Sequence, residues 1–149
     1  MAATVQDVTE SASTGTGSGS LTVSYPASLS AGDLLLMIGA TYHSTASNVN
    51  TPSGWTALWN QLTSNLRGWA FARVIADSTE AASLQGTTFT LQCSSGNFGA
   101  AVQIHRIGSF AGTIATDITY PTPTTAATVA IDPPSENASY SNEDTLFIA

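Results

Sequence analysis

The sequence has very little positive charge. Three arginines and no lysine stand against ten acidic residues, so the formal net charge is -7. Nucleic-acid binders use clustered lysine and arginine side chains, which release counterions from the phosphates. Only 9% of the residues carry any charge, whereas coiled coils are rich in Glu, Lys and Arg. The composition therefore excludes an ordinary nucleic-acid binder and a long-helix protein.

The chain also lacks a second cysteine and any long apolar run. Cys93 is alone and cannot form an internal disulfide, so packing must stabilise the fold. The longest apolar stretch, residues 34–38, is too short for a membrane span, which needs about 20 residues. Residues 1–19 have neither the basic flank nor the apolar segment of a secretory signal. No membrane partner is predicted.

Short segments in which apolar and polar residues alternate make up much of the chain. This period of two is typical of β-strands that lay one face on a core. The pattern occurs in residues 21–25, 66–76, 89–93, 98–107 and 125–131, and a further strand is expected at residues 144–149. Residues 34–38 are apolar at every position, so we expect a central strand that is buried on both faces.

Turn-forming residues separate these segments, and the helical period is almost absent. Seven or eight short strands predict an all-β fold, a two-sheet antiparallel β-sandwich of the jelly-roll or Ig-like kind, with the topology left open. Residues 41–53 and 108–123 are expected to be loops, and residues 77–86 to hold the only helical turn. Two parts are predicted: an N-terminal strand with a flexible Gly/Ser/Thr arm over residues 1–20, and the sandwich domain over residues 21–149.

The last residues raise the question of whether the natural chain continues. The sequence stops at Phe147-Ile148-Ala149, in the middle of an apolar strand and without a polar tail. We therefore expect a sandwich that lacks its last strands. The alternative is a terminal strand that docks into a sheet.

One predicted strand, residues 66–76, has a bulky face and a slim face. The bulky face carries Arg67, Trp69, Phe71 and Arg73, and the slim face carries glycine and alanine among its members. One interpretation places the aromatic rings in the core. The other treats Arg67, Trp69, Phe71 and Arg73 as a partly open binding site that docks a partner, with guanidinium groups stacked on the rings. A structural pair of Arg73 with Asp77 is an alternative for that arginine.

The residues predict no catalytic site, no metal site and no cofactor. The sequence has no Gly-x-Ser-x-Gly motif, and His43 and His105 are expected in surface or satisfied positions. Neither a His-x-x-x-His motif nor a cysteine pair offers metal ligands. Asp77 and Glu80 are the best local carboxylates for Ca²⁺, but solvated turn acids are the simpler interpretation. Cys93 is expected to be a small buried hydrophobe.

Several short motifs follow one another in a characteristic order and spacing. They are Gly32-Asp33-Leu34-Leu35, Pro52-Ser53-Gly54-Trp55, Phe71-Ala72-Arg73-Val74-Ile75-Ala76-Asp77, Phe89-Thr90-Leu91 and Ala100-Ala101-Val102-Gln103-Ile104-His105-Arg106-Ile107. In this respect residues 21–131 resemble a β-sandwich module that recurs in bacteriophage structural proteins and in marine viral sequences. The resemblance implies a virion surface part without catalytic residues. It also implies another pair of strands after the Asp144-Thr-Leu segment.

Two hypotheses about function follow, and an enzyme is the least favoured class. The first is a non-enzymatic phage virion protein, most simply a capsid decoration (cement) protein on the virion surface. Its partner is the major capsid or tail protein, and homo-oligomers, trimers among them, are expected. The second is a carbohydrate-binding or adhesin module, for example in a tail fibre, in which exposed tryptophans stack on sugar rings. Burial of Trp55, Trp59 and Trp69 favours the first hypothesis, and an exposed coplanar pair favours the second.

Overall fold

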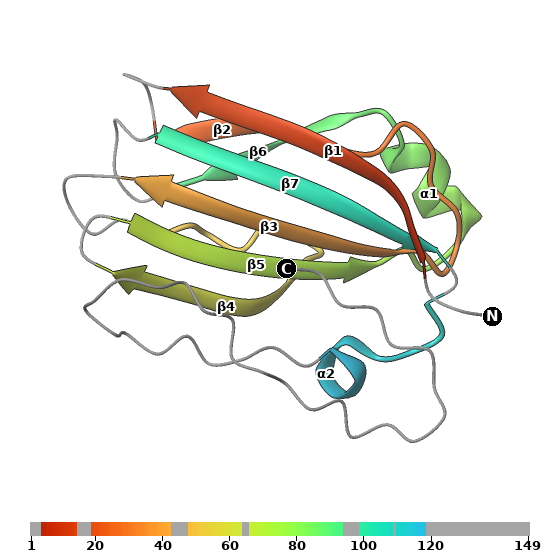
Figure 1. Ribbon diagram of the computed structural model, residues 1–149. Coiled ribbons are helices and arrows are strands. Elements are labelled where there is room, and N and C mark those ends of the chain that lie inside the picture. Colours follow the sequence, from red (N-terminus) through yellow and green to blue (C-terminus); the bar gives the residue numbers. More distant parts are fainter. Residues whose placement is uncertain are drawn as a thin grey trace.

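A computed structural model describes residues 4–14, 19–42, 48–63, 66–93, 99–108 and 110–118. These residues form two antiparallel β-sheets and two short helices (Figure 1). The predicted all-β class is therefore confirmed, and the two sheets pack as layers of a sandwich-like fold.

The larger sheet has five strands and the smaller has two. In spatial order the larger sheet contains β1 (Thr4–Thr14), β7 (Gly99–Gly108), β3 (Leu34–Tyr42), β5 (Leu66–Val74) and β4 (Thr56–Thr63). The smaller sheet pairs β2 (Ser20–Ser24) with β6 (Thr88–Gln92) and lies behind the larger one in Figure 1. The helices are α1 (Ser78–Leu84) and α2 (Ile114–Asp117).

The predicted central strand is confirmed as β3. It lies in the middle of the five-stranded sheet, between β7 and β5. Leu35 and Met37 on one face are fully buried in the main core, whereas Leu34 on the other face belongs to a second apolar cluster. A strand that is covered on both sides needs apolar residues at successive positions, and this explains the uninterrupted run.

The main core fills the space between the two sheets. Alternate residues of β2, β3, β5 and β7 point into it, as the period of two requires. Val49 and Trp55, which lie outside the strands, complete this core. The segment that holds them therefore serves as part of the second layer.

The expected helical turn is confirmed as α1. Asp77 is the N-cap residue, and its side chain accepts hydrogen bonds from the N–H groups of Thr79 at 2.9 Å and Glu80 at 2.8 Å. These bonds satisfy two backbone donors that have no partner within the helix.

Three features differ from the sequence-based expectations. The strand β4 has a bulge between Ala57 and Trp59, which breaks the alternating pattern and hides the strand in the sequence. The N-terminal strand extends into the residues expected to form the Gly/Ser/Thr arm, because β1 pairs with β7 as far as Thr14. The expected loop of residues 108–123 contains a second helix, α2, which Ile114 anchors on the second apolar cluster.

The predicted strands at residues 125–131 and 144–149 lie outside the described residues.

Candidate interaction surfaces

The bulky face of β5 is turned into the core. Trp69 and Phe71 are both 0% exposed, and their stacked rings have centroids 5.3 Å apart. Gly39 of β3 lies opposite Trp69, and a Cβ atom at this glycine would come within 2.2 Å of the indole. The indole thus occupies the space that a β3 side chain would need. Neither ring of the predicted binding site reaches the surface of this structure.

Arg73, at the end of β5, joins the sheet to α1. It forms an ion pair with Glu80, and its Nη1 donates a hydrogen bond to the Tyr25 hydroxyl at 3.1 Å. Glu80 also accepts a hydrogen bond from the Ala76 N–H at 2.6 Å. This bond, together with Arg73, holds the pKa of Glu80 below its ordinary value. Arg73 therefore pairs with Glu80 rather than with Asp77, whose carboxylate caps α1.

Arg67 lies half-buried at the opposite end of β5. Its Nη1 donates a hydrogen bond to the side-chain oxygen of Asn60 at 2.7 Å. Its Nε–H, the indole N–H of Trp69 and the hydroxyl of Thr41 are buried without a hydrogen-bond partner in the described part of the chain. Burial raises the pKa of the nearby Cys93 thiol, and the Arg67 charge acts against this rise. Arg67 is thus held against the body of the sandwich.

The outer face of the five-stranded sheet, which is turned away from β2 and β6, is apolar along β3 and β5 and carries Glu10, Gln103 and His105 on β1 and β7. At one end, Phe110, Ile114 and Ile118 cover a cluster formed by Leu34, Ala72 and Ile107. At the other end, Tyr42 and Leu66 face each other across β3 and β5 and are 59% and 48% exposed. Val5 and Val8 are also exposed, on the edge strand β1 beside the covered end. Among the described residues, β3 and β5 are therefore covered at one end of this face and exposed at the other.

The open part of the outer face is hollowed between β1, β7 and β3. A depression of about 520 Å³ lies there, with an apolar part that includes Ile38, Ala40 and Ala101 and a polar part that includes Glu10 and Gln103. His105 is on the outer face nearer the covered end, as the alternation predicts. It is half-buried, and this burial lowers its pKa. His43 lies outside the described residues.

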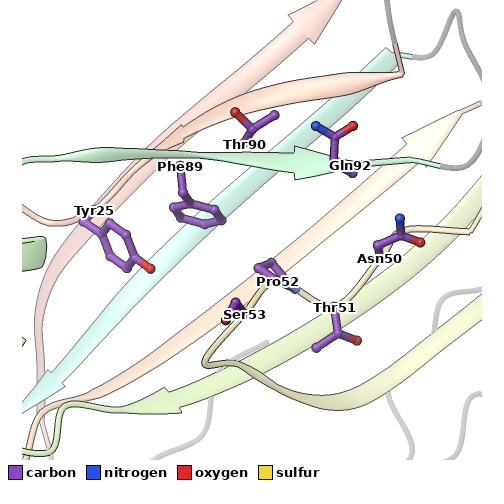
Figure 2. Close-up of a pocket in the computed structure, with 8 residues that line it drawn as sticks. All are labelled: Tyr25, Asn50, Thr51, Pro52, Ser53, Phe89, Thr90 and Gln92. Carbon is purple, nitrogen blue, oxygen red and sulfur yellow. The ribbon is translucent and has the colours of Figure 1, made fainter.

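A second groove opens at the free edge of the smaller sheet, between β6 and the segment that precedes β4. Its volume is about 390 Å³. Eight residues line this β6 groove: Tyr25, Asn50, Thr51, Pro52, Ser53, Phe89, Thr90 and Gln92 (Figure 2). None of the eight carries a charge at neutral pH. Three segments that are distant in the sequence therefore meet at one neutral site.

The β6 groove exists because strand pairing stops at Pro52. Val49 pairs with Cys93, and the Asn50 N–H donates to the Gln92 carbonyl at 2.9 Å. The same antiparallel register would next place Pro52 opposite Thr90. Proline has no N–H to donate, so the ladder cannot continue through it. The segment therefore leaves β6 and opens the groove.

Packed rings form the floor of the β6 groove: Phe89 is half-buried, and Tyr25 beneath it is 5% exposed. The Tyr25 centroid lies 4.9 Å from that of Phe89 and 6.2 Å from that of Trp55. The Tyr25 hydroxyl accepts a hydrogen bond from the Trp55 indole N–H at 3.3 Å, in addition to the bond from Arg73. Phe89-Thr90-Leu91 and Pro52-Ser53-Gly54-Trp55 are two of the sequence motifs, but neither pattern predicts a binding site, and no motif contains Tyr25.

Further observations concern metals and membranes. Within the ranges that the structure describes, no three side chains of His, Cys, Asp or Glu gather where they could hold a metal ion. Asp77 and Glu80, the best local carboxylates for Ca²⁺, are instead the α1 cap and the partner of Arg73. In the same ranges, no helix has both the length and the apolar character needed to cross a membrane.

No protein-family model matches the chain, and neither does any curated protein or solved structure.

Proposed function

We propose that the chain is a non-enzymatic structural protein of a bacteriophage virion, most simply a capsid decoration protein on the virion surface. The observation that carries this proposal is the open end of the outer face. Tyr42 and Leu66 are exposed there beside the depression between β1, β7 and β3. Exposed large apolar side chains beside a depression with a mixed apolar and polar lining are typical of a protein–protein interface. The partner is the major capsid protein or a tail protein.

Burial of the tryptophans supports the same proposal. Trp69 is fully buried, Trp55 is 7% exposed, and Trp59 is half-buried over Gly68. Exposed, coplanar tryptophans would favour a tryptophan-based sugar site instead. The rings of Trp55 and Trp69 belong to the main core, whereas Trp59 lies partly exposed on the outer face and adds an aromatic ring to it.

The sequence resemblance supplies the choice of partner. The module that it resembles is a β-sandwich, and the pattern of short strands favours the jelly-roll or Ig-like kind, which is the topology that we propose. The apolar outer face also suits contacts between copies, so we propose a homo-oligomer such as a trimer. In a trimer each copy would bury part of this face against a neighbour or the capsid.

The decisive experiment combines mass spectrometry of purified virions with a binding assay on particles that lack the protein. The protein should be found in the virions, and recombinant protein should rebind the depleted particles. Leu66→Asp should weaken rebinding by about tenfold or more, since a charge would be buried in an apolar contact. Thr88→Asp, on an exposed position of β6, is the matched control and should rebind as the unmodified chain does. Absence from virions, or unchanged rebinding of Leu66→Asp, would overturn the proposal.

A further inference from the structure

We propose that the β6 groove is a binding site for a neutral saccharide. This inference is independent of the virion proposal, because the groove and the outer face are on different layers of the sandwich. Four observations carry it: the aromatic floor, the polar rim, the uncharged lining, and the Tyr25 hydroxyl group, for whose proton no described residue is an acceptor.

The floor offers the apolar contact that a sugar ring needs. Pyranose rings have C–H faces that pack on aromatic side chains, and aromatic rings combine apolar area with a defined geometry. Figure 2 shows the rings of Tyr25 and Phe89 directed into the space between β6 and residues 50–53. Pro52 lies across from them and adds a third apolar surface. The volume of about 390 Å³ suits one or two sugar rings.

The Tyr25 hydroxyl is a hydrogen-bond donor without an acceptor. Its oxygen already accepts two hydrogen bonds, from Trp55 and from Arg73. A phenol has one O–H proton in addition to its lone pairs, so this proton is left to donate. None of the residues that the structure describes accepts it. Figure 2 shows the hydroxyl turned toward residues 50–53, where an oxygen of a bound sugar can take this bond.

The rim supplies donors and acceptors of the kind that sugar hydroxyls pair with. Asn50, Thr51 and Ser53 are exposed and contribute an amide and two hydroxyl groups. On the opposite side, the Thr90 side chain points away from the groove, so this residue presents its backbone edge. A few polar groups that converge around an apolar floor are the usual composition of a small-molecule site.

The lining also selects against charged ligands. Arg73, the nearest cation behind Tyr25, is already paired with Glu80. A charged ligand would lose hydration in the groove without meeting an opposite charge. The net charge of -7 further disfavours acidic sugars. The ligand class is therefore a neutral mono- or disaccharide unit.

An added β-strand is the main competing occupant of this groove. The outer edge of β6 has free backbone groups at Thr88 and Thr90, but the Gln92 carbonyl is already taken by Asn50. Strand addition draws its affinity from a row of main-chain hydrogen bonds. Thr88 and Thr90 alone would give an added strand only a short row of main-chain hydrogen bonds. The groove therefore favours the saccharide.

The test is a titration of the full chain with cellobiose, maltose, lactose and N,N′-diacetylchitobiose, followed by NMR and by tryptophan fluorescence. At least one saccharide should bind saturably, with shifts concentrated at Tyr25, Phe89 and residues 50–53. Trp55 should report binding, because its ring centroid lies 5.9 Å from that of Phe89. Sialyllactose serves as the acidic comparison and should bind more weakly than lactose.

Two variants and a matched control make the test specific. Phe89→Leu keeps an apolar side chain but removes the ring, and it should weaken binding by about tenfold. Asn50→Ala should weaken binding by a few-fold through loss of the rim amide. Gln61→Ala removes an exposed amide on β4 outside the groove and should leave binding unchanged. Unfolding midpoints are measured for all variants, so that a loss of folding can be told apart from a loss of binding. The NMR shifts of the unmodified chain locate the binding site without any variant.

Three outcomes would overturn the proposal. The first is the absence of saturable binding by every neutral saccharide. The second is binding whose NMR shifts fall outside the β6 groove. The third is preferential binding of a (Thr-Val)₃ peptide that is lost on backbone N-methylation, which would assign the site to strand addition. The virion assay above is unaffected by any of these results, so the two proposals fail separately.

Discussion

Asp33 is a buried carboxylate at the start of the central strand. It is 2% exposed and accepts hydrogen bonds from the Ser30 N–H at 2.7 Å and from Nε of Arg106 at 2.6 Å. Arg106 also donates to the Ser28 hydroxyl at 2.9 Å. This pair joins the C-terminal end of β7 to the loop before β3. It fixes the corner of the sheet at which β3 begins and β7 ends.

Removing one partner of this pair should be costly. We expect Arg106→Gln to lower the free energy of unfolding by about 3 kcal/mol, because Asp33 would remain buried without a cation. Urea unfolding measures the change. The double variant Arg106→Gln with Asp33→Asn should recover part of the loss, since no uncompensated charge is left. Gln61→Ala, an exposed change on β4 away from this pair, is the control and should stay within about 0.5 kcal/mol. Equal stabilities of the single and double variants would contradict this account.

Gly39 lies at a point of β3 where the packing leaves no room for a side chain. A Cβ atom there would come within 2.2 Å and 2.4 Å of the Trp69 ring and within 2.8 Å of the Ala101 carbonyl oxygen. The ring is buried in the main core and the carbonyl belongs to β7, so neither yields easily. Only glycine fits between them.

Gly39→Ala should therefore destabilise the fold by about 2–3 kcal/mol through overpacking. Gly108→Ala is the matched comparison, because the nearest atoms to its added Cβ, at 3.0 Å, are in the flexible side chain of Gln6. We expect less than about 1 kcal/mol there. Thermal and urea unfolding of both variants measure the difference. A Gly39→Ala protein as stable as Gly108→Ala would show that Trp69 has room to move.

At the scale of elements, α1 is short and depends on its first turn. Seven residues make a marginal helix, and its stability comes from the Asp77 cap, from buried Ala81 and from the pair of Glu80 with Arg73. Asp77→Ala should cost about 1 kcal/mol, and Asp77→Ser should restore most of it. Urea unfolding measures both variants. Equal losses in the two variants would mean that the cap hydrogen bonds do not act as described.

The strands were predictable to the extent that their alternation was regular. The patterns around Val23, Phe71, Leu91 and Val102 predicted β2, β5, β6 and β7, because one face of each meets the main core. The strand β4 was missed because its bulge shifts the period by one residue. Alternation also showed that β5 has a bulky face without showing which side that face meets. Only the position of the smaller sheet decides that Trp69 and Phe71 lie inside.

The β6 groove was beyond the reach of sequence analysis for a different reason. Tyr25, Pro52 and Phe89 are far apart in the chain, and no local pattern predicts that they meet. Pro52 marks where pairing must stop, but its partner strand becomes known only from the register of Val49 with Cys93. Such a site depends on topology, which the strand pattern left open.

At the scale of the whole molecule, the two layers are unequal. Five strands form one layer, whereas the other consists of β2, β6 and the segment that carries Val49 and Trp55 (Figure 1). The β6 groove is the seam between the last two of these parts. In the part of the chain that the structure describes, the second layer thus has a recess at its edge, while the opposite layer presents the broad outer face. The two surfaces for which we propose partners are therefore separate.

The stability of the whole molecule should fall as the pH is lowered, and two groups fix the sign. The pKa of Glu80 lies below its ordinary value in the folded state, so its contribution is full above about pH 4.5 and is lost as the pH falls through the folded value. The pKa of His105 is also lowered, because burial disfavours its charged form. The unfolded chain therefore takes up that proton first, and stability is lost as the pH falls from about 6.5 toward the folded value.

These two steps can be separated by urea unfolding at pH 7.5, 5.5, 4 and 3. His105→Gln should flatten the decrease between pH 7.5 and 5.5, and Glu80→Gln should flatten the decrease below about pH 4.5. Each effect should be about 1 kcal/mol or less, since both side chains are partly exposed to solvent. Glu80→Gln should also lower stability at pH 7.5, because Arg73 and the Ala76 N–H would lose a charged acceptor. A pH profile that neither substitution changes would mean that protons act on carboxylates elsewhere in this acidic chain.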